Sequence, residues 1–375
     1  MTTDQDFGRD DAGAGATTDG RPRLEPFSFT GSAGEYFRIW IVNLFLSIIT
    51  LGLYTPWAKV RRLKYFYGNT WLDGHNFDYV ADPKKILKGR LIVIGVLIAV
   101  NVLVNISPFF AVLFIPYLVA FPWLLNKSMA FNARNTVYRN VRFGFAGSYG
   151  GALKAFILWP IGAYFTISLL LPFFFRAMNR YIGSSTRWGQ AKFETVSGVG
   201  PYYRNLGRTI LVSLVLFILL ILLGLLLIFL LSLLSVLFGF ETVMENNFTE
   251  SNIQALAPFL SMFFLYPLML GSFFYHAAGV RNIAFNSTIL DRKHQLMSRL
   301  VRGRYLWIMV SNLIATLLSL GLLRAWAATR TWAYLADHTA LEIDGDLDSI
   351  IDTAQAEGNV AAAEYFDIEG IDFGL

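Results

Sequence analysis

The sequence contains no cysteine and little charge, since only 15% of its 375 residues are Asp, Glu, Lys or Arg, against about 25% in ordinary soluble domains. The missing cysteine excludes disulfides, thiolate metal sites and a cysteine nucleophile. The four histidines are scattered, and the chain has no HExxH, P-loop, GxGxxG or Ser–His–Asp pattern. The sequence therefore predicts no catalytic residue, no metal site and no cofactor, and a protein that is not an enzyme.

Apolar residues are abundant instead. They make up 55% of the chain, with 33 Phe and 9 Trp, and the mean hydropathy is +0.49. A helix needs about 20 apolar residues to cross a bilayer. Because Ser107-Pro108 divides the longest run, we count seven apolar segments. The runs without charged residues are 39–58, 91–126, 155–175, 209–240, 251–280 and 305–323.

These segments predict a mainly α fold. We expect a polytopic helical membrane protein with internal repeats, about six to seven apolar segments and short cytoplasmic β-hairpin-like elements. We expect a disordered polar tail over 1–26, a repeat-built transmembrane domain over 27–340, and an acidic tail over 341–375. The expected location is a membrane, which the chain crosses several times.

Charge is distributed unevenly along the chain. Residues 1–26 and 337–375 together hold three basic and 17 acidic residues, which leaves 28 basic and nine acidic residues between them. Basic connections are typical of the cytoplasmic side. The excess of +19 predicts anionic lipid headgroups as partners and no nucleic acid; protein partners and oligomeric state are left open.

An internal match relates the two ends of the apolar region. Shifting the chain by 269 residues places 34–72 over 303–341, with 14 of 39 positions identical. The pairs include Asn43/Asn312, Trp57/Trp326 and Arg61/Arg330. A polar residue followed by Thr also recurs five times, at 69–70, 135–136, 185–186, 287–288 and 338–339. The pattern predicts a repeated unit of membrane helix, basic aromatic helix end, turn and short strand.

The path of one segment is ambiguous. Ala155–Phe175 has 21 uncharged residues, an ideal length for one span. Alternatively, Trp159–Gly162 breaks it into a short hairpin, which keeps all basic stretches on the cytoplasmic side. Both paths remain open at the level of sequence.

Polar residues inside apolar runs are the candidate sites. Asn43 and Asn312 occupy matched positions, and Asn101 and Asn105 lie four residues apart on one helix face. They either line a path for a solute or form hydrogen bonds between helices, worth about 0.6–2 kcal/mol.

Aromatic and basic residues at the helix ends form a second group of candidates. Trp57 with Arg61, and Trp326 with Arg330, suit either an interfacial belt or a headgroup site.

Two stretches resemble a known family. The first is Phe29–Phe37, followed by the run from Thr50 to Thr70 that reads TLGLYTPWAKVRRLKYFYGNT, and the second is Glu364–Leu375. They resemble the YjgN family of bacterial inner-membrane proteins, a domain of unknown function. The resemblance covers about 27–375 and implies membrane location and bacterial origin, but no reaction and no catalytic residues.

Two functions are compatible with this sequence. Repetition and matched intramembrane Asn residues favour transport or permeation of a small solute or ion through a helical bundle. The basic body and the absence of carboxylates from the apolar runs favour a non-catalytic protein that binds lipid or scaffolds partners.

Overall fold

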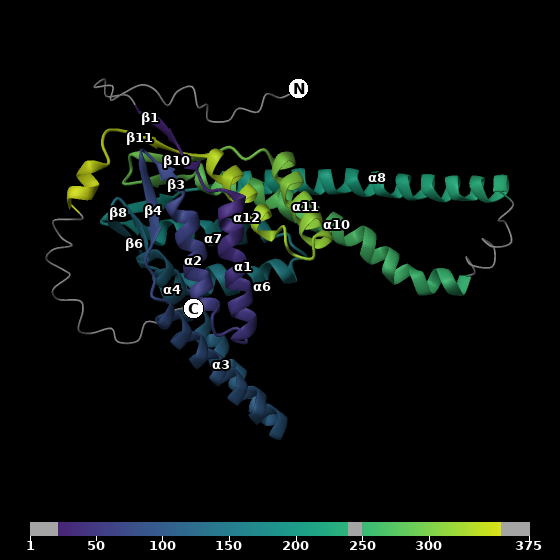
Figure 1. The fold of residues 1–375 in the computed structure, drawn as a ribbon, viewed down its shortest axis with the longest axis horizontal. Coiled ribbons are helices and arrows are strands. Elements are labelled where there is room, and N and C mark those ends of the chain that lie inside the picture. Colours follow the sequence, from purple (N-terminus) through teal and green to yellow (C-terminus); the bar gives the residue numbers. More distant parts are fainter. Residues whose placement is uncertain (1–21, 239–249, 354–375) are drawn as a thin grey trace.

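The computed structural model describes residues 22–238 and 250–353, and its helices project from one sheet (Figure 1). The helices are α1 (Ala33–Ile49), α2 (Thr55–Gly68), α3 (Pro83–Ile106), η2 (Pro108–Leu113), α4 (Phe114–Arg134), α5 (Tyr149–Leu153), η3 (Lys154–Leu158), α6 (Trp159–Phe165), α7 (Leu171–Ser185), α8 (Gly200–Phe238), α10 (Glu250–Phe285), α11 (Arg302–Leu318) and α12 (Arg324–Asp337). The strands are β1 (Arg23–Pro26), β2 (Ser28–Phe29), β3 (Thr70–Leu72), β4 (His75–Tyr79), β5 (Thr136–Tyr138), β6 (Val141–Phe145), β7 (Thr186–Trp188), β8 (Ala191–Thr195), β9 (Thr288–Leu290), β10 (His294–Ser298) and β11 (Thr339–Ile343).

The predicted fold class is wrong, because the strands are not separate hairpins on a helical bundle. Within the described residues they form one 11-stranded sheet in the order β1-β11-β10-β9-β8-β7-β6-β5-β4-β3-β2. Every pair of neighbours is antiparallel. The recurring polar residue followed by Thr predicted a short strand in each repeated unit, but pairing between distant segments has no local signal.

Tight turns set the register of the hairpins. Leu72 pairs with His75 and Tyr138 with Val141, which leaves two-residue loops. Asp73, Gly74, Arg139 and Asn140 all have positive φ, as the mirror-image turns of such loops require. A one-residue slip would turn every inward side chain outward, so these turns fix which side chains face the core.

The segment 23–29 closes the sheet on itself. Its first half, β1, pairs with β11, and its second half, β2, pairs with β3. Phe27 lies between them and donates its N–H to the Thr339 carbonyl over 2.9 Å. The two ends of the strand order are therefore neighbouring parts of one short segment.

Aromatic side chains fill the closed sheet. Phe77 stacks against Phe27 at 5.9 Å and lies 6.5 Å from Phe143, which in turn lies 6.4 Å from Phe193. Trp188 is buried in the same cluster, which also includes Leu347, Ile350 and Ile351 from the chain after β11. Since this cluster takes side chains from across the strand order, it is the interior of the sheet.

Each helical excursion starts from the sheet and returns to it. The chain leaves through α1, α3, α5, α8 and α11 and comes back through α2, α4, α7, α10 and α12, each of which runs into the next strand. All helices therefore join the sheet at one end, opposite the hairpin turns. Because one sheet lies on one side of a membrane, every excursion must return to the side from which it left.

Three helices are long and apolar enough to cross a membrane, judged by length and composition among the described residues: Pro83–Ile106, Pro108–Arg134 and Gly200–Phe238. The predicted number of six to seven apolar segments is therefore wrong as a count of candidate spans. The break at Ser107-Pro108 is present between α3 and η2. The connection 241–250 carries three Glu and no basic residue, which predicts the outer side, and it lies almost wholly outside the described residues.

The runs 39–58, 155–175 and 305–323 fold into short helical hairpins, α1/α2, α6/α7 and α11/α12, whereas 251–280 belongs to the long helix α10. Their tips carry consecutive residues with positive φ at Leu51-Gly52, Ile167-Ser168 and Leu320-Gly321. Leu51, Ile167 and Leu320 are 94%, 93% and 95% exposed, so each tip presents an apolar side chain to its surroundings. In the 155–175 segment the turn lies at 166–170, beyond the predicted break at 159–162.

Both predicted tails lie mainly outside the described residues, as does the family-like stretch 364–375. The described parts next to them belong to the sheet. Arg23–Pro26 is β1, and β11 extends to Ile343. The boundary expected at 340/341 falls within β11, and the one expected at 26/27 falls at the end of β1.

The sheet carries a pH-sensitive contact at His294, which is 1% exposed and accepts the Asp344 backbone N–H at Nδ1 over 3.2 Å. Burial lowers the pKa of His294 from its usual value of 6.5. Below pH 6.5 the unfolded chain takes up the proton before the folded chain does. Stability therefore decreases as the pH is lowered, by at most about 1.4 kcal/mol per pH unit.

We expect the midpoint temperature of thermal unfolding in detergent to decrease as the pH is lowered from about 7.5 to about 5.5. The His294→Gln variant is expected to lose that part of the slope. His75→Gln is the control, because His75 is an exposed histidine of β4. Equal slopes in wild type and His294→Gln would show that His294 does not titrate in this range.

Candidate functional site

Three helices that return to the sheet carry a Trp and a basic residue four positions apart. Each Trp stands 13 residues, and each basic residue nine, before the Thr that opens the next strand. At 1.5 Å per residue, these residues lie about 14–20 Å along their helices from that Thr. The pairs are Trp57–Arg61 on α2, Trp123–Lys127 on α4 and Trp326–Arg330 on α12. Trp beside a cation at one level is typical of a membrane interface.

Arg330 contacts both Trp326 and Asn312, which were separate candidate sites in the sequence. Its guanidinium lies 5.1 Å from the Trp326 ring. Nη1 of Arg330 donates to Ser311 Oγ over 2.7 Å and to Asn312 Oδ1 over 3.0 Å. Since these acceptors are on α11, Arg330 connects the two helices of the last hairpin.

Asn312 completes this contact. It is 6% exposed, and its Nδ2 donates to the Ala327 carbonyl (3.1 Å) and to Thr331 Oγ1 (2.9 Å). The amide thus uses both its donor and its acceptor end to hold α11 against α12. The sequence left two roles open for Asn312, a path for a solute and hydrogen bonding between helices. This geometry supports hydrogen bonding between helices.

Asn43 has different surroundings, although it occupies the matched position. It is 7% exposed, and its Oδ1 is buried without a hydrogen bond from any described residue. Arg61 corresponds to Arg330, yet it lies over the Tyr54 ring at 5.7 Å. Trp57 also stacks on Tyr54, at 5.9 Å. The matched residues therefore form a polar network in the last hairpin and an aromatic–basic cluster in the first.

Asn101 and Asn105 bond to each other on the exposed surface of α3. Nδ2 of Asn105 donates to the Asn101 carbonyl over 2.8 Å and approaches Asn101 Oδ1 at 3.2 Å. Both side chains are exposed. They share one helix face, as predicted, but form a local contact in which no second helix takes part among the described residues.

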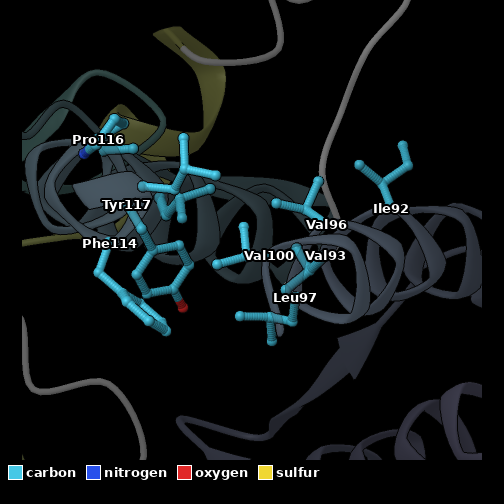
Figure 2. A pocket seen from close by; sticks show the side chains of 11 residues that line it. Ile92, Val93, Val96, Leu97, Val100, Phe114, Pro116 and Tyr117 are labelled. Atoms are coloured by element: carbon cyan, nitrogen blue, oxygen red, sulfur yellow. The ribbon is translucent and has the colours of Figure 1, made fainter. Parts of the chain in front are cut away.

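An apolar groove lies between α3 and α4. It has a volume of about 420 Å³, within the range of ligand pockets, and Figure 2 shows side chains of the two helices on opposite sides of it. Val96 and Val100 come from α3, and Phe114, Tyr117 and Leu124 come from α4. The Tyr117 hydroxyl is the one polar side-chain group among the described residues that line it, so the groove suits hydrocarbon.

Neither this groove nor the Trp123–Lys127 pair was predicted from the sequence. The signal for the pair was available, because Trp123 and Lys127 precede Thr136 by the same distances that separate Trp57 and Arg61 from Thr70. The groove depends on how two helices diverge, which periodicity does not encode. In the described parts of the chain, no three His, Asp or Glu residues are grouped to hold a metal ion.

Comparison with known proteins places this architecture in a family. Over residues 24–368 the sequence matches the family described as "Bacterial protein of unknown function (DUF898)". The chain belongs to this family. Its similarity to YjgN proteins, suggested by the Phe29–Phe37 and Thr50–Thr70 stretches, is confirmed by curated relatives.

Two of these relatives are named inner membrane protein YjgN. The Salmonella typhimurium protein is 33% identical over 119 residues, which are 31% of this chain and 30% of the relative. The Escherichia coli K12 protein is 32% identical over 137 residues, which are 36% and 34%. The chain thus spans about a third of the length of these relatives. No solved structure matches. The relatives named inner membrane protein YjgN and the three candidate spans support a membrane protein.

Proposed function

We propose that this membrane protein binds phospholipid from the side, with acyl chains in the groove between α3 and α4. The groove carries the proposal, because its lining side chains are apolar and belong to two candidate spans. Such a groove takes up a chain from the bilayer without a path for water. The function is binding rather than catalysis and corresponds to the second of the two functions compatible with the sequence.

The Trp and basic residues at the helix ends support lipid binding. They lie at a common distance along their helices from the strand that follows, a level that suits headgroups beside a helix that leaves the bilayer core. We place the sheet on the cytoplasmic side of the inner membrane, because the +19 excess of residues 27–336 lies in the stretches next to it. In this arrangement the chain passes the membrane several times, and the helix–hairpin units are copies of one repeated element.

Filling the groove tests the proposal. Ala120 lines it on α4, so an Ala120→Phe substitution puts a ring where an acyl chain would lie. We expect the variant, purified in mild detergent, to retain several-fold less phospholipid than wild type when lipid is counted by mass spectrometry.

Ala111→Phe is the matched control, because Ala111 lies in η2 and is exposed. It makes the same change outside the groove and is expected to retain lipid as wild type does. If Ala120→Phe and Ala111→Phe retain equal amounts, the groove holds no lipid.

Transport of a small solute or ion is a second candidate, and the polar groups between the short helices favour it. Asn43 has a buried Oδ1 that lacks a donor among the described residues, and Asn312 binds Arg330. If they lie on a path, liposomes with the protein will pass a solute from a panel of ions and metabolites. Asn43→Ala would change the flux, while Asn105→Ala, on the surface of α3, would not. Absence of flux across the panel would rule out transport of those solutes.

A further inference from the structure

A second pocket, of about 360 Å³, lies where α4 meets β6 and β7. Three cationic side chains line it: Lys127 and Arg134 from α4, and Arg187 from β7. None of the ten described residues that line it is Asp or Glu. A concave site with three cations and no carboxylate in its wall favours an anion.

Gly144 on β6 gives Arg187 its position. A Cβ atom on Gly144 would lie 2.5 Å from Arg187 Nε and 2.9 Å from its Cγ. The Arg187 side chain therefore lies across the neighbouring strand, in the space that a larger residue would occupy. The missing side chain of Gly144 directs the guanidinium into the pocket wall.

Tyr181 orients a neutral donor in the same pocket. Its hydroxyl donates to Asn126 Oδ1 over 2.5 Å and lies 2.9 Å from the Ser148 carbonyl oxygen. With Oδ1 used in this way, the other end of the amide is Nδ2, which carries two N–H donors. Asn126 lines the pocket next to Lys127, so the site combines a neutral donor with charged ones.

The pocket lies next to the apolar groove along α4. Leu124 lines the groove, whereas Trp123 and Lys127 line the polar pocket. Tyr149 of α5 forms another part of the wall and donates its hydroxyl to the Val119 carbonyl on α4 over 2.8 Å. Hydrocarbon in the groove and an anion in the pocket would therefore be separated by about one helical turn.

We propose that this pocket binds a phosphate group. The guanidinium of Arg187 suits two parallel hydrogen bonds to phosphate oxygens, Lys127 supplies a point charge, and Asn126 Nδ2 supplies a neutral donor. The phosphate belongs to an anionic lipid headgroup or to a soluble phosphate compound. Only the lipid source rests on the function proposed above; the phosphate chemistry stands without it.

The test uses full-length protein with two probes. Retention of phosphatidylglycerol against phosphatidylcholine is measured by native mass spectrometry, and binding of inorganic phosphate by equilibrium dialysis. Arg187→Gln removes one charge. Gly144→Ala keeps every charge and displaces Arg187. We expect each to lower occupancy by the anionic probe roughly tenfold.

Lys88→Gln is the control, because Lys88 is an exposed lysine on α3 and the change in net charge is the same. It is expected to bind like wild type. Thermal unfolding of each variant is measured alongside, so that a loss of binding with an unchanged midpoint is assigned to the pocket.

The two probes separate the outcomes. Loss of phosphatidylglycerol alone in both variants assigns the pocket to a lipid headgroup, and loss of inorganic phosphate alone assigns it to a soluble compound. If Ala120→Phe removes lipid while Arg187→Gln and Gly144→Ala bind both probes like wild type, the groove function stands and the phosphate site is refuted. If neither probe binds wild type, the site is also refuted.

Discussion

A chain that begins at Thr30 is expected to lose its folded sheet and to aggregate. It lacks 23–29, and with it the partner of β11 on one side and of β3 on the other. Both strands become free edges, whose unpaired N–H and C=O groups pair with other chains. The loss of Phe27 also removes a ring from the stack on Phe77, which opens the interior to water.

Size-exclusion chromatography in detergent measures this effect as a shift of the monodisperse peak to the void volume. A chain that begins at Pro22 is the control, because it keeps β1 and β2 and so retains both edge pairings. A normal elution profile for the chain that begins at Thr30 would show that the remaining strands close without this segment.

Arg281→Met is expected to destabilise the fold by about 2–4 kcal/mol, since a partly buried cation that donates two hydrogen bonds is replaced by a thioether. Arg281 donates to Ser298 Oγ over 2.6 Å and to Thr339 Oγ1 over 2.8 Å. These residues face each other on β10 and β11. The guanidinium also lies 4.1 Å from the Phe285 ring, a contact that Met largely retains.

Urea unfolding followed by tryptophan fluorescence measures this loss. Arg292→Met is the matched control, since the Arg292 side chain is 85% exposed and pairs at 3.3 Å with the half-exposed Glu194. Its effect is expected to stay within about 0.5 kcal/mol. Equal midpoints for the two variants would mean that Arg281 contributes nothing specific to the junction of β10 and β11.

The neighbouring asparagines explain why this junction is sensitive. Asn282 Oδ1 accepts the Leu300 N–H over 3.0 Å, and Asn286 Oδ1 accepts the Ser298 N–H over 2.6 Å. The end of α10 therefore holds the end of β10 through side-chain amides and Arg281 together. Side-chain networks of this kind are worth more than the sum of separate deletions suggests.

Membrane association and the break at Ser107-Pro108 were predictable because they depend on local composition. The short strand around Phe77 was also visible, since Phe77 and Tyr79 alternate with polar residues. Closure of the sheet was not, because Arg23 pairs with Ile343, 320 residues away. No periodicity reports a contact over that distance.

The short hairpins show how a visible signal was misjudged. Leu51-Gly52 and Leu320-Gly321 match in the sequence, and both turn the chain with positive φ. An apolar run that contains Leu-Gly reads as a continuous span, because hydropathy does not register backbone conformation. Among the candidate residues, Asn312 and Arg330 were both singled out from the sequence, but their mutual hydrogen bond depends on the same turn.

The shape of these three hairpins has a consequence for the bilayer itself. With 17 residues, α1 and α11 are about 25 Å long, less than the roughly 30 Å of a hydrocarbon core. A hairpin that enters and leaves on the sheet side adds cross-sectional area mainly to the near leaflet. If the hairpins enter the bilayer as proposed, three of them around one sheet expand that leaflet relative to the opposite one, so we expect the protein to prefer a membrane that is convex on the sheet side.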